Sequence, residues 1–309
     1  MVIMASSVRY AELHVHLEGA LDEATLLEIA PDLDSEEIAR NYRFSNFAGF
    51  LSSFKFAAMQ LREPWQFQLL ARRMFARMAA DGIVYAEVIH SAGICLWRGL
   101  DARAIVEALM EEGRRAPLTV RWILDAVRQL GPAHAMQVAR FAVEFGPGEI
   151  VAFGVGGDEL GASAEALGPA FALAGSQGLK LVPHAGETST AQNVWDALLL
   201  GAHRIGHGIR SIEDPALIAE LVRRNVPLEI SIRSNVLTGA VASLADHPVK
   251  RLFDAGVPIV LNTDDPAFFR TTLDQEFALA RSHFGFTPEQ LEGVRRNGFI
   301  YAFGPASET

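Results

Sequence analysis

Cysteine is almost absent from this sequence of 309 residues, in which Cys95 is the one example. A single cysteine excludes an internal disulfide and any zinc site built from several thiolates. Basic residues are scarce as well, because 27 lysines and arginines face 37 acidic residues and give a net charge of -10. This balance argues against nucleic acid or a membrane surface as a partner, since no basic excess is available to neutralise phosphates.

Long hydrophobic runs are missing too. No apolar stretch approaches the roughly 20 residues that a transmembrane helix requires, and residues 1–10 lack the charged head and apolar segment of a secretory signal. Half of the composition is nevertheless apolar, which is enough for a large buried core. We therefore predict a soluble, cytoplasmic protein.

Short apolar segments alternate with longer segments of helical periodicity along the whole chain. The expected strands are 10–13, 84–89, 120–127, 150–155, 179–183, 204–205, 227–232 and 259–261. The expected helices are 21–29, 65–78, 102–115, 132–145, 163–177, 191–200, 215–224 and 273–284, with a helix or loop at 244–255. Strict alternation requires parallel strands, and eight of them close naturally into a barrel. We predict an α/β protein, a (β/α)8 TIM barrel, as a single domain over residues 1–309.

An open doubly wound sheet is the rival architecture. It would carry a Gly-x-Gly-x-x-Gly turn after its first strand, and the sequence has no such turn there. Gly154-Val155-Gly156-Gly157 is only a partial imitation of that motif, and it follows a later strand. The barrel is therefore the better prediction.

Polar side chains stand at the ends of several expected strands. They are His14 and His16, His184 with Glu187 beyond it, His207, and Asp264 with Asp265. Because functional residues of a barrel gather at the carboxyl ends of its strands, these side chains are expected to converge. Three imidazoles and a carboxylate suit a zinc ion that keeps room for water. No lysine ends the fourth strand, so a carbamylated lysine bridging two metals is excluded, and we predict one Zn²⁺ per chain.

Each of these motifs has an ordinary explanation when it stands alone. A His-x-His pair often lies on a surface, and Asp-Asp-Pro often forms a turn. The other histidines receive that structural interpretation: His134, His203 and His283 on helices or before a strand, and His247 in a loop. His90 ends the second strand, and its role stays open.

Four motifs together resemble those of the adenosine deaminase family, over nearly the whole chain. They are His14-Val15-His16-Leu17-Glu18-Gly19, His184-Ala185-Gly186-Glu187, Arg204-Ile205-Gly206-His207-Gly208 and Asn262-Thr263-Asp264-Asp265-Pro266. The resemblance implies a single-zinc barrel that hydrolyses the 6-amino group of aminopurines. It implies His14, His16, His184 and Asp264 as zinc ligands. It further implies Glu187 as proton donor to purine N1, His207 as partner of the zinc-bound water, Asp265 as partner of N7, the Gly157 backbone as partner of N3, and Glu18 as the ribose contact.

The pocket departs from the family pattern in two places. Ser231-Ile232-Arg233 replaces the usual Cys-Pro-x before Ser-Asn, and Ile89 stands where an arginine is usual. The aromatic segment 44–56 corresponds to a helical lid over the substrate. Residues 91–98 resemble the branch that deaminates 6-aminodeoxyfutalosine, an adenosine with a benzoate-containing 5′ chain, in menaquinone synthesis.

We therefore predict a purine nucleoside, either adenosine or 6-aminodeoxyfutalosine, as the small-molecule substrate. Three alternatives stay open. One is an adenine deaminase acting on the free base, and another is a metal-dependent amidohydrolase of non-purine substrates. The third is an inactive barrel that serves only as a binding module. The sequence does not determine the number of subunits.

Overall fold

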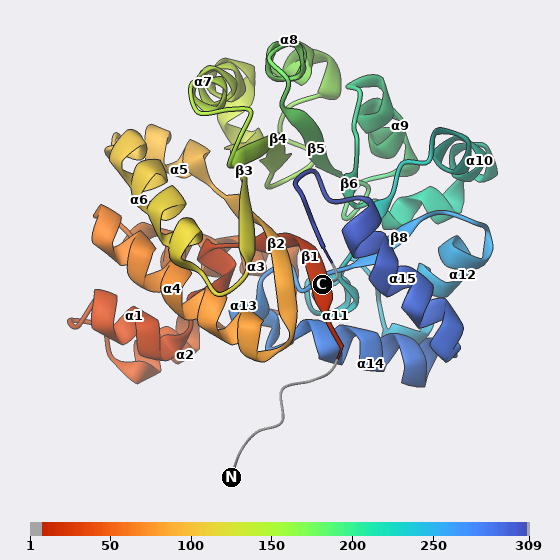
Figure 1. Ribbon diagram of the computed structural model, residues 1–309, viewed down its shortest axis with the longest axis horizontal. Coiled ribbons are helices and arrows are strands. Elements are labelled where there is room, and N and C mark those ends of the chain that lie inside the picture. Colours follow the sequence, from red (N-terminus) through yellow and green to blue (C-terminus); the bar gives the residue numbers. More distant parts are fainter. Residues whose placement is uncertain (1–7, 308–309) are drawn as a thin grey trace.

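The apolar segments form eight strands that pair side by side in sequence order and curve into a barrel (Figure 1). The computed structural model describes residues 8–307. The strands are β1 (Tyr10–His16), β2 (Ile83–His90), β3 (Thr119–Val127), β4 (Ile150–Gly156), β5 (Lys180–Ala185), β6 (Ile205–His207), β7 (Leu228–Ile230) and β8 (Ile259–Leu261). All seven neighbouring pairs are parallel. The predicted (β/α)8 barrel is confirmed.

Helices surround the strands in Figure 1. Those that follow the predicted alternation are α4 (Pro64–Ala80), α6 (Ala102–Arg115), α7 (Gly131–Val143), α8 (Ala164–Ser176), α9 (Ala191–Leu199), α10 (Pro215–Arg224), α12 (Val249–Asp254) and α14 (Leu273–Phe284). Between β1 and β2 the chain also forms α1 (Glu23–Ile29), α2 (Ser35–Asn41) and α3 (Phe47–Gln60). Among the described helices, none combines the length and hydrophobicity needed to cross a lipid bilayer.

The barrel closes between β8 and β1 through the residues that follow β8. His16 donates its backbone N–H to the Asp264 carbonyl at 2.8 Å, and Asp264 donates to the His14 carbonyl at 3.2 Å. Below this point the Asn262 side-chain oxygen accepts from the backbone N–H groups of Leu13 and His14. An amide side chain thus replaces part of the ladder that a longer β8 would supply, which satisfies buried donors of β1.

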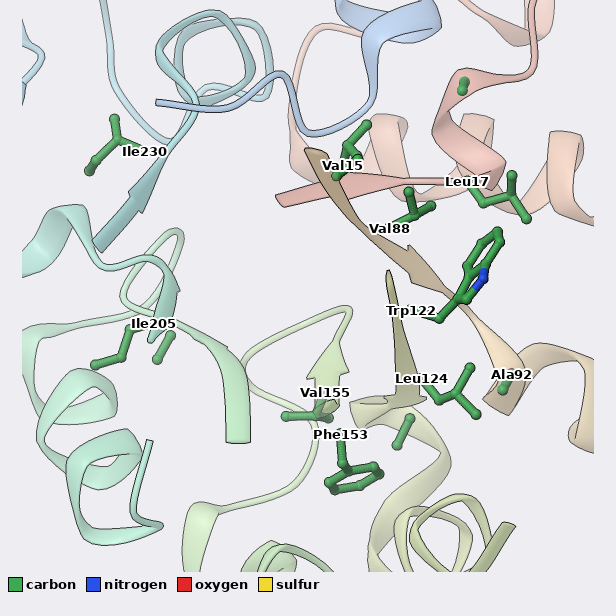
Figure 2. Close-up of a cluster of buried hydrophobic side chains, with 14 of the residues drawn as sticks. Val15, Leu17, Val88, Ala92, Trp122, Leu124, Phe153, Val155, Ile205 and Ile230 are labelled. Atoms are coloured by element: carbon green, nitrogen blue, oxygen red, sulfur yellow. The ribbon is translucent and has the colours of Figure 1, made fainter. Parts of the chain in front are cut away.

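The two faces of the strands belong to different clusters, as the period of two in a strand requires. The large cluster includes Val88, Trp122, Leu124, Phe153 and Val155, and Figure 2 shows these side chains spread over several strands. The residues between them face the barrel interior. Ile89, Ile123, Ala152 and Val182 pack there as a separate small cluster. Above this apolar layer, the inward positions carry the polar side chains of the site.

One strand was predicted too long, and one helix was not predicted. The strand predicted over 227–232 covers only Leu228–Ile230, and α11 (Ile232–Leu237) begins directly after it. The strand ends early because of a residue elsewhere in the chain. The Ile232 backbone N–H donates to the Glu276 carboxylate at 2.8 Å and not to a neighbouring strand. The final helix α15 (Pro288–Ile300) was not predicted at all.

The segment after α15 lies against the strands at their amino-terminal ends. The Gly304 backbone N–H donates to the Tyr85 hydroxyl at 2.8 Å. Arg204 donates to the Tyr301 carbonyl at 2.8 Å, and its guanidinium carbon lies 3.7 Å from the centre of the Phe303 ring. These contacts close one end of the barrel and leave the other end for the site.

Candidate active site

A cavity of about 380 Å³ opens at the carboxyl ends of the strands. Its polar lining includes side chains from the motifs at the strand ends together with Asp125, which lies near the end of β3. These polar residues include His16, Asp125, His184, Glu187, His207, Asp264 and Asp265. The sequence-predicted residues that the structure brings to this cavity therefore come from β1, β5 and β6 and from the residues that follow β4, β5 and β8.

The imidazoles face one another at the bottom of the cavity. His16 Nε2 lies 3.2 Å from His184 Nε2 and 3.4 Å from Asp264 Oδ1. His14 Nε2 lies 3.5 Å from the same carboxylate oxygen. Nitrogen lone pairs that converge on a buried carboxylate are the arrangement that zinc requires. His14, His184 and His207 also bring ligand atoms within 4.8 Å of one another, as do His14, His16 and Asp264.

The outer ring nitrogens explain why the lone pairs converge. His184 Nδ1 lies 3.1 Å from the Val155 carbonyl, which can only accept, so the proton resides on Nδ1 and the Nε2 lone pair faces the centre. His14 Nδ1 likewise donates to the Glu229 carboxylate at 2.7 Å. Its buried Nε2 has no hydrogen-bond partner among the described residues. Because such outer partners orient metal ligands, this donor set fits a zinc ion.

Glu229 connects the site to a buried arginine. Arg204 donates to Glu229 through Nε and to Glu87 through Nη2, and all three side chains are fully buried. Burial alone would raise the pKa of Glu229, but Arg204 and His14 hold that pKa below its usual value. Glu229 is therefore charged and can fix the His14 ring. Sequence reasoning missed this residue, since it appeared only as a polar position inside an apolar strand.

Glu187 is placed by a second carboxylate, that of Glu159. Glu159 accepts backbone N–H groups from three consecutive residues, Gly186 at 2.6 Å, Glu187 at 2.8 Å and Thr188 at 2.9 Å. It also accepts from the Ser189 hydroxyl. The loop after β5 thus wraps around a buried negative charge. Glu159 lies two residues after Gly157, and sequence reasoning gave it no role.

Burial and the neighbouring Asp264 charge raise the pKa of Glu187 well above its usual value. Glu187 is therefore a neutral acid in the folded protein, which is the form that can donate a proton. Its Oε2 lies 3.7 Å from His207 Nε2. Burial lowers the pKa of His207 to about 4, so this imidazole is neutral. A proton donor and a neutral imidazole face the same space.

The neighbouring carboxyl groups of Asp264 and Asp265 have pKa values shifted in opposite directions. Burial opposes ionisation of Asp264, but the His14 imidazole 3.5 Å away and the other nearby imidazoles lower its pKa well below the usual value. Burial and Asp264 raise the pKa of Asp265 well above its usual value. Asp264 is thus the anion, also bound by the Ser234 hydroxyl at 2.6 Å, and Asp265 is a neutral acid.

The structure places Gly157 at the cavity and Glu18 away from its lining. Gly157 has φ +95, and its missing Cβ leaves room for the Gln129 side chain. The Glu18 carboxylate instead accepts from the Ser91 backbone N–H at 3.1 Å and from His90 Nδ1 at 2.8 Å. His90, whose role was open, is fully buried and holds Glu18.

The aromatic segment forms one wall of the cavity. Phe47, Phe50 and Phe54 of α3 line it together with Lys55, and Trp97 of α5 (Ala92–Trp97) lines it as well. The same side chains pack outward, as in the 5.1 Å contact of Phe50 with Phe269. This segment therefore lines the cavity and packs against its surroundings, while its role as a lid over the substrate stays a prediction.

The profile of the adenosine deaminase family matches residues 10–309. The chain belongs to this family. It is therefore a deaminase in class, a hydrolase that acts on carbon–nitrogen bonds. An aminodeoxyfutalosine deaminase from Streptomyces coelicolor is 36% identical over 308 residues, covering 95% of this chain and 79% of the relative. An adenine deaminase from Rhizobium meliloti is 33% identical over 309 residues, covering 97% and 95%.

Solved structures of the family agree with the fold. The adenine deaminase from Arthrobacter aurescens superimposes with a TM-score of 0.89 at 27% identity, over 97% of this chain and 94% of that one. An amidohydrolase from Burkhoderia ambifaria with bound zinc superimposes with a TM-score of 0.87 at 26% identity, over 96% and 86%. The zinc in that relative accords with the donor set found here.

Proposed function

We propose that this protein is a zinc-dependent hydrolytic deaminase. It converts the 6-amino group of an adenosine-like nucleoside to a 6-oxo group and releases ammonia. The observation that carries the proposal is the buried Glu187 carboxyl group, which lies 3.7 Å from His207 Nε2 beside the imidazole and Asp264 cluster and whose pKa is raised by that burial. Deamination of an aromatic ring needs such an acid, because the ring nitrogen must take a proton as the nucleophile adds to the neighbouring carbon.

His14, His16, His184 and Asp264 would hold the zinc ion. When bound, zinc lowers the pKa of water toward about 7 and so supplies hydroxide at neutral pH. The chain's own residues do the rest. Glu187 gives its proton to purine N1 as oxygen adds to C6, and His207 orients the attacking oxygen on one face of the ring. The hydroxyl proton of the added oxygen then passes to the amino group, the C6–N bond breaks, and ammonia leaves with a 6-oxo group on the ring.

Asp265 and Gly157 orient the purine in this proposal. Purine N7 is an acceptor, so its partner must carry a proton, and the raised pKa of Asp265 meets that requirement. The Asp265 Oδ1 atom is buried and has no hydrogen-bond partner among the described residues. The Gly157 backbone N–H is the proposed partner of N3.

A nucleoside with an extended 5′ group is the proposed substrate. The cavity continues from the imidazoles to Phe54, Lys55 and Trp97, beyond the space that a purine base fills. Lys55 Nζ lies 5.9 Å from the Trp97 ring centre and pairs with no carboxylate of the described residues. An aromatic and cationic wall suits a benzoate-containing chain. With 6-aminodeoxyfutalosine as substrate, the enzyme would act in menaquinone synthesis.

Adenine is the second candidate, and one observation favours it. The Glu18 carboxylate is already engaged by His90 and Ser91, so it offers little to a ribose hydroxyl. The relative from Rhizobium meliloti is also named an adenine deaminase.

Ammonia release from 6-aminodeoxyfutalosine, adenosine and adenine tests the proposal. Glu187→Gln should keep zinc and lose turnover on the order of 10²–10⁴-fold; a variant near wild-type activity contradicts the assignment.

Lys55→Met should raise KM for the tailed nucleoside roughly fivefold while the KM for adenosine is unaffected, as expected for about 1 kcal/mol from a partly exposed ion pair. Lys180→Met, at the start of β5, is the matched control. Equal turnover of adenine and the nucleosides would favour the second candidate.

A further inference from the structure

His247 lies in the loop before α12, and the structure buries it to 4% exposure beneath the active site. The backbone N–H of Val249 donates to His247 Nδ1 at 3.2 Å. A backbone amide can only donate, so Nδ1 carries the lone pair. Burial lowers the pKa of His247 to about 3, so the ring is neutral and its proton resides on Nε2.

This proton determines how the Asn235 side chain is turned. His247 Nε2 lies 3.2 Å from Asn235 Oδ1, and the protonated nitrogen donates to that oxygen. The Asn235 amide nitrogen then lies 3.1 Å from His207 Nδ1. An amide NH₂ also only donates, so His207 Nδ1 must accept and His207 carries its proton on Nε2.

We propose that His247 and Asn235 are positioning residues that set the tautomer of His207. These hydrogen bonds start at the backbone amide of Val249, which can only donate. Turning the Asn235 amide alone would therefore place a donor against a donor at His247. Asn235 is fully buried and His207 is 1% exposed, so the contact between these two side chains is shielded from bulk water. His207 itself has φ 62, a left-handed backbone conformation that residues other than glycine rarely adopt.

The consequence is that His207 presents an N–H to the cavity. Its Nε2 lies 3.7 Å from Glu187 Oε2 and 3.9 Å from Asp264 Oδ2, so a donor points at the space between two carboxyl groups. This inference rests on the proposed function for its kinetic meaning. His207 holds the attacking oxygen by donation, and in this tautomer its Nε2 cannot accept the proton of that oxygen.

Asn235→Asp tests the inference with almost no change of shape. A carboxylate can only accept, so it should draw the His207 proton to Nδ1. NMR of the imidazole nitrogens in protein with ¹⁵N-labelled histidine should show the Nε2–H tautomer in wild type and the Nδ1–H form in the variant. Turnover should fall on the order of 10²-fold with KM and zinc content little changed. Asn193→Asp, on α9 away from the cavity, is the charge-matched control.

His247 is tested by comparing two replacements. His247→Gln keeps an amide that can donate to Asn235, whereas His247→Phe keeps the ring volume but no donor. The Gln variant should retain most turnover and the Phe variant should approach Asn235→Asp. Equal losses in both variants would overturn the inference, because packing alone would then explain them.

The NMR measurement separates this inference from the proposed function. A wild-type His207 with its proton on Nδ1 refutes the inference, whatever the enzyme turns over. The inference is likewise wrong if Asn235→Asp leaves both tautomer and turnover unchanged. Failure of every purine to release ammonia refutes the proposed function, while the nitrogen spectra still decide the tautomer.

Discussion

Replacement of Glu159 by glutamine should loosen the loop that carries the proposed acid. One carboxylate oxygen accepts from the backbone N–H groups of Glu187 and Thr188, and the other accepts from Gly186 and the Ser189 hydroxyl. Glutamine keeps one acceptor oxygen and replaces the other with an NH₂ group. Two donors therefore lose their acceptor and face another donor in a site that is only 4% exposed.

The size of the effect follows from the two lost bonds. A hydrogen bond to a charged group contributes about 1.5 kcal/mol at the low end, so Glu159→Gln should lower the free energy of unfolding by about 3 kcal/mol. For a chain of 309 residues, an unfolding entropy of about 2.1 cal/mol/K per residue gives ~0.65 kcal/mol/K. The melting temperature should therefore fall by about 5 °C.

Turnover should fall as well, because Glu187 is held by the same loop. A misplacement of about 1 Å can cost on the order of 10²-fold in rate. Thermal unfolding, kcat and zinc content should be measured on Glu159→Gln and on Glu165→Gln, an exposed carboxylate at the start of α8. A Glu159 variant that melts and turns over like the control would refute the view that this carboxylate positions the acid.

Three further outcomes are expected. Because burial raises the pKa of Glu187 and only its protonated form donates, kcat/KM should decline as pH rises through that pKa; a profile of kcat/KM against pH that rises there contradicts this. Glu229→Gln removes the charge of the outer partner of His14 and leaves one acceptor oxygen for both His14 and Arg204, so it should weaken zinc binding about 10–100-fold in a chelator competition, with unchanged affinity as the opposing result. Gly19→Ala would place a Cβ 1.9 Å from Asp265 Oδ1, so kcat/KM should drop sharply while the barrel persists in circular dichroism; full activity would show that Asp265 can shift without loss.

Much of the architecture was predictable because it depends on local patterns. Helical periodicity gave α6, α10 and α14 with their observed ends, and β8 was also placed correctly. The polar positions at strand ends needed only one further rule, that these ends share a rim. His16, His184, Glu187 and Asp264 meet in the cavity for that reason.

The supporting residues were not predictable in the same way. Glu229 is a single polar residue in a strand, and His247 precedes a proline in a loop, so neither has a local signal of its role. Their function arises from partners far along the chain, His14 for the first and Asn235 with His207 for the second. The early end of β7 also depends on a distant partner, because the Ile232 backbone N–H donates to Glu276 on α14.

The carboxyl-terminal segment has a consequence for how this protein can be handled and redesigned. Tyr301 and Phe303 hold Arg204 in place, Arg204 pairs with Glu229, and Glu229 orients His14 on the opposite rim. The contacts at one end of the barrel are therefore coupled, through buried charges, to the orientation of His14 at the other end. We therefore expect replacement of the Phe303 ring to change zinc retention, and a directed-evolution screen for tighter zinc binding has reason to begin there.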